Sequence, residues 1–146
     1  MHKASSEHFR ILFVDDEVQA VKYFEKAFGR RFSVQTATSA DEAMAMLENS
    51  DDFAVVVTDQ RMPGRTGVSL LSYLRESRPE IIRILTTAYA DLDSAIAAVN
   101  SGEIFRYITK PWNLKSLEAE LDHALEFFSL RRERDQLLNE KLAVVH

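Results

Sequence analysis

The stretch Phe53-Ala54-Val55-Val56-Val57-Thr58-Asp59-Gln60-Arg61-Met62-Pro63-Gly64 joins an apolar run to a carboxylate and a turn. A continuous run of β-branched and apolar residues predicts a strand that is buried on both faces, as in the middle of a parallel sheet. Ligands of open α/β sheets bind outside the carboxyl ends of the strands, so Asp59 is a candidate functional residue. The alternative is that Asp59 merely opens the turn before Pro63-Gly64, and this stretch alone does not separate the two.

The rest of the chain alternates short apolar runs with segments of helical periodicity. Ser39 with Glu42 forms a capping box at the start of one helix, and Asp91 or Asp93 is placed to cap another. The other expected strands are 11–14, 32–37, 81–85 and 104–108, and the expected helices are 18–28, 39–47, 68–74, 91–101 and 113–128. Five strands that alternate with helices predict an α/β fold with a doubly wound, five-stranded parallel sheet and helices on both faces.

Composition limits the classes of function. The chain has 146 residues, 46% hydrophobic and 28% charged, which suits one globular domain. A net charge of -5 argues against direct nucleic-acid binding through the bulk field of the domain. The absence of cysteine excludes disulfides, thiolate metal sites and cysteine nucleophiles. No apolar run reaches membrane-spanning length and no signal peptide is visible, so we expect a cytoplasmic protein without membrane contact.

The two ends of the chain differ from its middle. We expect residues 1–8 to be flexible, residues 9–128 to form the domain, and residues 129–146 to continue the last helix as an extension. Leu130, Leu137 and Val144 recur at heptad spacing, which is compatible with a coiled coil that forms a homodimer or links to an output domain beyond residue 146. A solvated tail is the alternative. The histidines show no metal-ligand spacing and are expected to be bystanders: His2, His8, His123 and His146.

Acidic residues follow two of the predicted strands. Asp15 and Asp16 follow the first strand and Asp59 ends the third, and in a doubly wound sheet these two strands lie side by side. Three carboxylates at close range need a cation, and an oxygen-lined site of this kind suits Mg²⁺. Lys110 and Thr87, at the ends of the fifth and fourth strands, complete a set suited to binding a phosphoryl group. Taken singly, each residue also has an ordinary structural role, such as a helix cap for Asp15-Asp16.

In these motifs the chain resembles the receiver domains of bacterial two-component response regulators, over roughly Phe9 to Phe128. Receivers have a flavodoxin-like fold, an acidic pair after the first strand and a phosphorylated aspartate at the end of the third. A Thr or Ser and a small residue end the fourth strand, and a Lys-Pro pair ends the fifth, with a switch aromatic three residues before the lysine. The matching residues here are Asp15, Asp16, Asp59, Thr87, Ala88, Tyr107, Lys110 and Pro111.

The resemblance implies a phosphorylation-controlled switch. A sensor histidine kinase or phosphotransfer protein would donate a phosphoryl group to Asp59. Mg²⁺ would be held by Asp16, Asp59 and the backbone carbonyl of Arg61, and by Asp15 directly or through water. Lys110 would pair with a phosphoryl oxygen.

The resemblance also implies how the signal leaves the site. Thr87 would move to the phosphoryl group, Tyr107 would turn inward, and the face of the fourth helix, fifth strand and fifth helix would change to control an output domain or a partner protein. The small Ala88 would admit the phosphoryl group. Arg61 and Tyr89 would tune hydrolysis. The resemblance further implies a cis Lys110-Pro111 bond.

The implied activity is self-catalysed phosphotransfer and autodephosphorylation rather than that of a dedicated metabolic enzyme. A Mg²⁺-dependent phosphohydrolase of the haloacid dehalogenase type is the alternative. That class has a second aspartate two residues after its nucleophile, and Arg61 stands there. A nucleotide- or flavin-binding module on the same fold would need a glycine-rich loop after the first strand, where Asp15-Asp16 would instead repel the ligand.

Overall fold

The computed structural model of the protein describes residues 9–102 and 104–145. Within them a five-stranded parallel sheet has the order β2-β1-β3-β4-β5, so the first and third strands are neighbours, as expected. The strands are β1 (Arg10–Val14), β2 (Val34–Ala37), β3 (Phe53–Asp59), β4 (Ile82–Thr87) and β5 (Arg106–Thr109). This confirms the predicted doubly wound α/β architecture.

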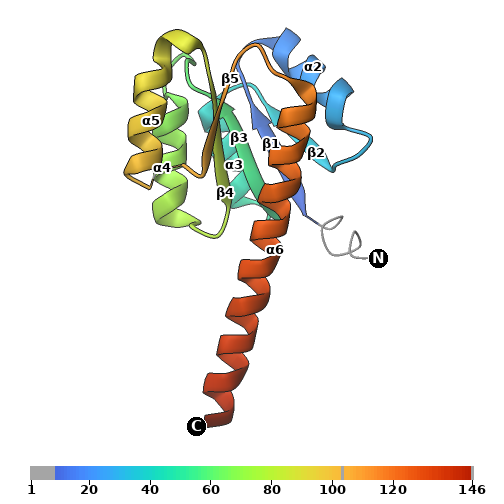
Figure 1. The fold of residues 1–146 in the computed structure, drawn as a ribbon, viewed down its shortest axis with the longest axis vertical. Helices are drawn as coiled ribbons and strands as arrows, with labels where there is room; N and C mark the ends of the chain where they lie inside the picture. Colours follow the sequence, from blue (N-terminus) through green and yellow to red (C-terminus); the bar gives the residue numbers. More distant parts are fainter. Residues whose placement is uncertain (1–8, 103, 146) are drawn as a thin grey trace.

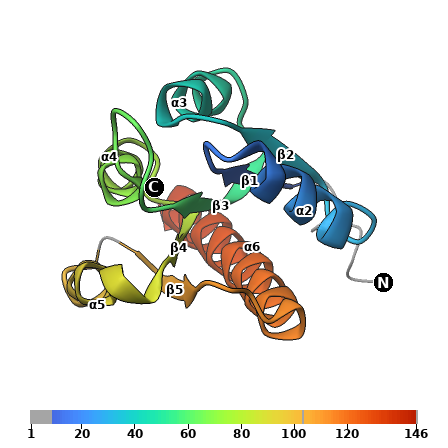
Figure 2. The same cartoon turned by 90° about the horizontal axis from the view of Figure 1, so that it is seen from above.

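Helices cover both faces of the sheet (Figures 1 and 2). The helices are α2 (Val18–Phe28), α3 (Ala40–Glu48), α4 (Gly67–Ser77), the 3-10 turn η1 (Tyr89–Asp91), α5 (Leu92–Asn100) and α6 (Leu114–Val145). One core cluster joins the sheet to α3, α4 and α5, and a second joins it to α2 and α6. Every residue of β3 is buried, which is what a continuous apolar run between two helical layers predicts.

The two edge strands begin later than the sequence suggested. β2 begins at Val34 rather than Phe32, whose ring packs in the core before the strand starts. β5 begins at Arg106 rather than at residue 104, and its residues are half-buried or exposed. Tyr107 is therefore half-buried. An edge strand has one neighbour instead of two, so its apolar pattern is shorter and its boundary is less sharply encoded.

The helix caps follow the sequence in part. Ser39 accepts a hydrogen bond from the Glu42 N–H at 3.0 Å, as the capping box predicts, while the Glu42 carboxylate accepts from the N–H of Thr38. Asn113 caps α6 by accepting from the Ser116 N–H at 3.0 Å. Asp91 occupies the N-cap position of α5 but makes no capping hydrogen bond with its side chain. Its carboxylate has another partner.

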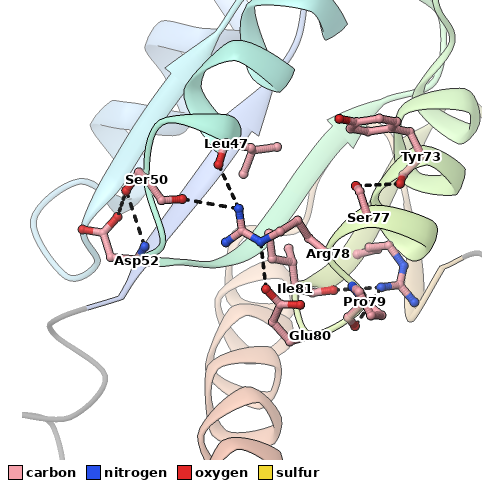
Figure 3. A network of polar contacts seen from close by, with 10 residues as sticks. Leu47, Ser50, Asp52, Tyr73, Ser77, Arg78, Pro79, Glu80 and Ile81 are labelled. Atoms are coloured by element: carbon pink, nitrogen blue, oxygen red, sulfur yellow. Dashed lines mark hydrogen bonds and ion pairs between the residues drawn. The ribbon is translucent and has the colours of Figure 1, made fainter.

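Arg78 connects the carboxyl ends of α3 and α4 (Figure 3). Its Nη1 donates to the carbonyl oxygen of Leu47 at 2.8 Å and to that of Ser50 at 3.4 Å, and its Nε donates to Glu80 at 2.8 Å. Carbonyl groups in the last turn of a helix lack intrahelical partners, so the guanidinium satisfies an acceptor that the end of α3 leaves open.

The last helix continues well past the domain body (Figure 1). Five of its apolar residues are buried against the sheet, namely Leu117, Leu121, Ala124, Leu125 and Phe128, while Leu114 is 37% exposed. Beyond Phe128 the helix remains continuous to Val145, and Leu130, Leu137 and Leu142 are 59%, 60% and 60% exposed. No helix within the described ranges has both the length and the apolar character needed to cross a bilayer. The expectations for residues 1–8 and for His146 lie outside the described residues.

Candidate functional site

The three predicted acids converge at the carboxyl end of the sheet. β1 ends at Val14, so Asp15 and Asp16 follow it directly, and β3 ends at Asp59 beside it. One carboxylate oxygen from each acid lies within 4.8 Å of the other two. Asp15 is fully buried and Asp59 is 7% exposed, whereas Asp16 is open to solvent. Three ligating oxygens thus face one small space with one side open.

Lys110 reaches the same cluster from the end of β5. Its Nζ lies 2.9 Å from Asp59 Oδ1 and 3.2 Å from Asp15 Oδ2. Burial by itself would lower the pKa of Lys110, but the hydrogen bond with Asp59 and the charges of Asp15 and Asp59 outweigh it and raise the pKa, so the ammonium stays charged. The Lys110-Pro111 peptide bond is cis, as expected.

The pKa of Asp59 is raised even though Lys110 touches it. Burial removes water from the carboxylate and is the largest effect, Lys110 opposes it, and the charge of Asp15 adds to it. The raised pKa of Asp59 and the raised pKa of Lys110 are consistent, because one ammonium contacts two carboxylates and Asp16 adds a third acid nearby. The cluster therefore has an excess of negative charge, and a further cation is favourable there.

The ends of β4 and β5 lie beside each other next to the acids. Thr87 is the last residue of β4, is fully buried, and pairs with Thr109 in β5. Its hydroxyl donates to the carbonyl oxygen of Ala88 at 3.3 Å, and its own carbonyl accepts from the Lys110 N–H at 2.9 Å. Tyr107 pairs with Leu85 and packs against the core cluster under α5.

The loop after Asp59 is tied to the start of α4. The Gln60 carbonyl accepts from the Gly67 N–H at 2.9 Å, and the Gln60 side-chain oxygen accepts from the Val68 N–H at 2.9 Å. A Cβ on Gly67 would overlap the backbone oxygen of Asp59, so only glycine allows this approach. The backbone that carries Asp59 is held firmly on its α4 side.

An ion pair that the sequence did not predict borders the site. Arg61 Nε and Nη2 each donate to a different carboxylate oxygen of Asp91, both at 2.7 Å. The two residues are 30 positions apart, and each is an ordinary surface type with an ordinary local role, so no periodicity or motif connects them. Tyr89, the other residue expected to flank the site, is 77% exposed, and His123 is also exposed.

Comparison with known proteins identifies the family. The model of the response regulator receiver domain matches residues 11–122. The chain belongs to the response regulator receiver domain family. The hydrogenase transcriptional regulatory protein HoxA of Cupriavidus necator is 38% identical to this receiver over 133 residues, which are 91% of this chain and 27% of that protein.

Solved structures of similar proteins share the fold. A response regulator receiver domain protein from Clostridium thermocellum is 30% identical with a TM-score of 0.79, covering 84% of this chain and 98% of that one. A structure described as adenylate cyclase from Rhodopirellula baltica is 32% identical with a TM-score of 0.86, covering 89% of this chain and 96% of that one. This receiver spans about a quarter of the length of the curated relatives it matches. Family membership supports a role in phosphorylation-controlled signalling.

Proposed function

We propose that this receiver accepts a phosphoryl group on Asp59 from a sensor histidine kinase or phosphotransfer protein and passes the signal on as a change of shape. The observation that carries the proposal is the position of Asp59. Its carboxylate stands at the carboxyl end of the central strand, 2.9 Å from the Lys110 ammonium and beside two further acids. A carboxylate in such a cationic and acidic setting is suited to nucleophilic attack on phosphorus.

The transfer exchanges a bond between phosphorus and nitrogen for one between phosphorus and oxygen. An oxygen of the Asp59 carboxylate forms a bond to phosphorus while the bond between phosphorus and the donor histidine nitrogen breaks, and its electron pair stays on the imidazole. Lys110 neutralises charge on a phosphoryl oxygen. Dephosphorylation returns the switch to its resting state. A water oxygen attacks phosphorus, the bond between phosphorus and the Asp59 oxygen breaks, and the products are the Asp59 carboxylate and inorganic phosphate.

The acidic cluster fits Mg²⁺ by its donor chemistry. Carboxylate oxygens and a backbone carbonyl are the hard ligands that this ion takes, and Asp16 leaves one side open for water. Asp16, Asp59 and the backbone carbonyl of Arg61 would hold it, with Asp15 binding directly or through water. When bound, the ion neutralises charge on the phosphoryl oxygens during transfer.

Thr87, Ala88 and Tyr107 would carry the change away from Asp59. The Thr87 hydroxyl, now bonded to the Ala88 carbonyl, would turn to a phosphoryl oxygen, which the small Ala88 leaves room for. Tyr107 would then fill the space beside β4. Because Tyr107 belongs to β5, the face formed by α5, β5 and α6 would be repacked.

The extension of α6 would carry the output. We expect residues 129–145 to pair with the same segment of a second copy, because four leucines there are at least half exposed: Leu130, Leu137, Leu138 and Leu142. The same segment would serve as a linker to an output domain, as suits a chain whose relatives are transcriptional regulators more than three times as long. If the extensions pair, a change in the face of α5, β5 and α6 would alter the pairing and thereby the activity of the output domain.

The phosphoacceptor is tested with Mg²⁺ and acetyl phosphate as the donor. The wild-type protein should acquire an acid-stable, base-labile phosphoryl label. The label should be lost in Asp59→Asn and on chelation of Mg²⁺. A label that persists in Asp59→Asn, or that is equal with Mg²⁺ removed, would contradict the assignment.

Lys110→Ala separates acceptance from switching. The remaining acids can still hold a cation, so we expect the variant to accept the label, whereas amide chemical shifts in α5 and β5 should no longer change on phosphorylation. If the amide chemical shifts of the labelled variant change as they do in the wild type, Lys110 is not needed for switching.

The phosphohydrolase alternative has no support, since Arg61 pairs with Asp91 and supplies no second carboxyl group. We expect no turnover of a small phosphomonoester.

A further inference from the structure

Asp91 stands at the N-cap of α5 without capping it. An aspartate at this position usually accepts a hydrogen bond from the N–H of the second or third helical residue, here Asp93 or Ser94. The side chain of Asp91 makes no such bond, and its backbone has φ −105 and ψ 15 instead of an extended conformation. Both of its oxygens accept from Arg61, each at 2.7 Å. We call this pair the Arg61–Asp91 clasp.

The clasp joins the two loops that border Asp59. Arg61 lies on the loop that leaves β3, and Asp91 ends the turn that leaves β4. The Arg61 side chain is 76% exposed and that of Asp91 is 16% exposed, so the guanidinium has room to turn away from the carboxylate. The Asp91 N–H donates to the Ala88 carbonyl at 2.9 Å, which fixes Asp91 to the residue beside Thr87.

A phosphoryl group on Asp59 would compete with Asp91 for the same guanidinium. It brings a charge of roughly −1.5 to −2 and several acceptor oxygens within two residues of Arg61. Arginine binds phosphate oxygens in the same forked geometry that it uses for carboxylates. Asp91, once released, would face the positive end of α5, where a backbone N–H group of the first helical turn can donate to its carboxylate.

We infer that the Arg61–Asp91 clasp exchanges partners on phosphorylation: Arg61 passes from Asp91 to the phosphoryl group, and Asp91 passes from Arg61 to the first turn of α5. Arg61 would contact the phosphoryl group itself, and Asp91 is a positioning residue that acts through Arg61. The clasp opposes phosphoryl binding in the resting state and reports it at the start of α5, a route separate from Thr87 and Tyr107. The inference rests on the proposed function, because it requires Asp59 to carry the group.

The affinity test uses the whole chain with Mg²⁺ and beryllofluoride, a stable stand-in for a phosphoryl group on a carboxylate. Asp91→Asn removes the charge that holds Arg61 but keeps an oxygen that can cap α5. It should bind beryllofluoride about two- to fivefold more tightly than the wild type, which is what an exposed ion pair supplies. Arg61→Ala should bind no more tightly than wild type, and adding Asp91→Asn to it should change nothing further.

Arg65→Ala is the matched control. Arg65 belongs to the same loop and forms its own exposed pair with Asp41 at 3.7 Å, so its removal takes the same charge from the same segment. The dissociation constant should stay at the wild-type value. A second readout is amide hydrogen exchange at Asp93 and Ser94, which beryllofluoride should slow in the wild type but not in Asp91→Ala.

The outcomes separate the two proposals. Equal dissociation constants for the wild type and Asp91→Asn, or slowed exchange that persists in Asp91→Ala, would overturn the clasp exchange and leave Asp59 as the acceptor. A wild type that does not bind beryllofluoride, or binding that is undiminished in Asp59→Asn, would overturn the proposed function and the clasp exchange with it.

Discussion

Burial of Asp59 in the acidic site disfavours the ionised form of its carboxyl group. Its side chain is 10% exposed, and Lys110, which touches it, also serves Asp15. The pKa of Asp59 is raised mainly by burial, so the folded state favours the neutral form more than the unfolded state does. Stability from this group is present below the ordinary aspartate pKa of 3.8 and is lost as pH rises through the raised folded value.

Asp59→Asn should therefore stabilise the metal-free protein at pH 7. The amide removes a desolvated charge, and Lys110 keeps Asp15 as a partner at 3.2 Å. In chelator, the free energy of unfolding in urea should exceed that of the wild type at pH 7, and the difference should shrink as pH falls toward 4. Added Mg²⁺ should stabilise the wild type and have little effect on the variant.

The control for this prediction is Asp41→Asn, because Asp41 is an acid whose side chain is 86% exposed. Its effect on stability should be small at every pH. A metal-free Asp59→Asn protein that is less stable than the wild type at pH 7 would show that the Lys110 pair outweighs burial.

The site residues that could be predicted from the sequence are those at the carboxyl ends of parallel strands, because these ends meet at one edge of the sheet. Asp15, Asp59 and Lys110 each follow or end a strand, so strand prediction alone placed them at one edge. Asp91 was assigned to a helix cap by the same kind of local rule, and here the rule failed. A cap and an ion pair compete for one carboxylate, and sequence does not show which partner is nearer.

Among the elements, burial explains which boundaries the sequence predicted well. α2 has the predicted bounds, and β3 ends at Asp59 as predicted, because apolar periodicity and full burial mark them. β5 begins two residues late at the sheet edge, where half-exposed positions tolerate polar residues. The continuation of α6 to Val145 was expected from the lack of a glycine or proline, which are the usual helix terminators.

Arg78 offers a test of how the elements are held together. Arg78→Ala should lower the free energy of unfolding by about 1–2 kcal/mol, since the Leu47 and Ser50 carbonyls lose a charged donor. Arg78→Lys should lower the free energy of unfolding by a smaller amount, because a single ammonium group cannot reproduce the forked set of N–H donors of the guanidinium. Urea unfolding measures both. Arg30→Ala, in the exposed turn after α2, is the control and should cost little. An Arg78→Ala cost no larger than the control's would show that the Arg78 contacts in Figure 3 add nothing to stability.

At the scale of the whole molecule, the protein is a domain from which one long helix, α6, extends. α6 has 32 residues, which at 1.5 Å each gives a helix about 48 Å long. Its first half is anchored on the sheet through Leu117, Leu121 and Phe128, so a change in the α5, β5 and α6 face reaches the extension through one continuous helix. The exposed leucines beyond Phe128 are 51% to 60% exposed and belong to neither core cluster of the described residues.

If the extension pairs two copies, the 146-residue chain should sediment as a dimer and a chain ending at Phe128 as a monomer. Leu137→Lys in the 146-residue chain should also give a monomer, because it places a charge in the apolar stripe of Leu130 and Leu137. Gln136→Lys introduces the same charge about 100° around the helix, away from that stripe, and should remain a dimer. A 146-residue chain that sediments as a monomer at micromolar concentrations would show instead that residues 129–145 are a solvated helix. The signal would then have to reach its target through the face of α5, β5 and α6 alone.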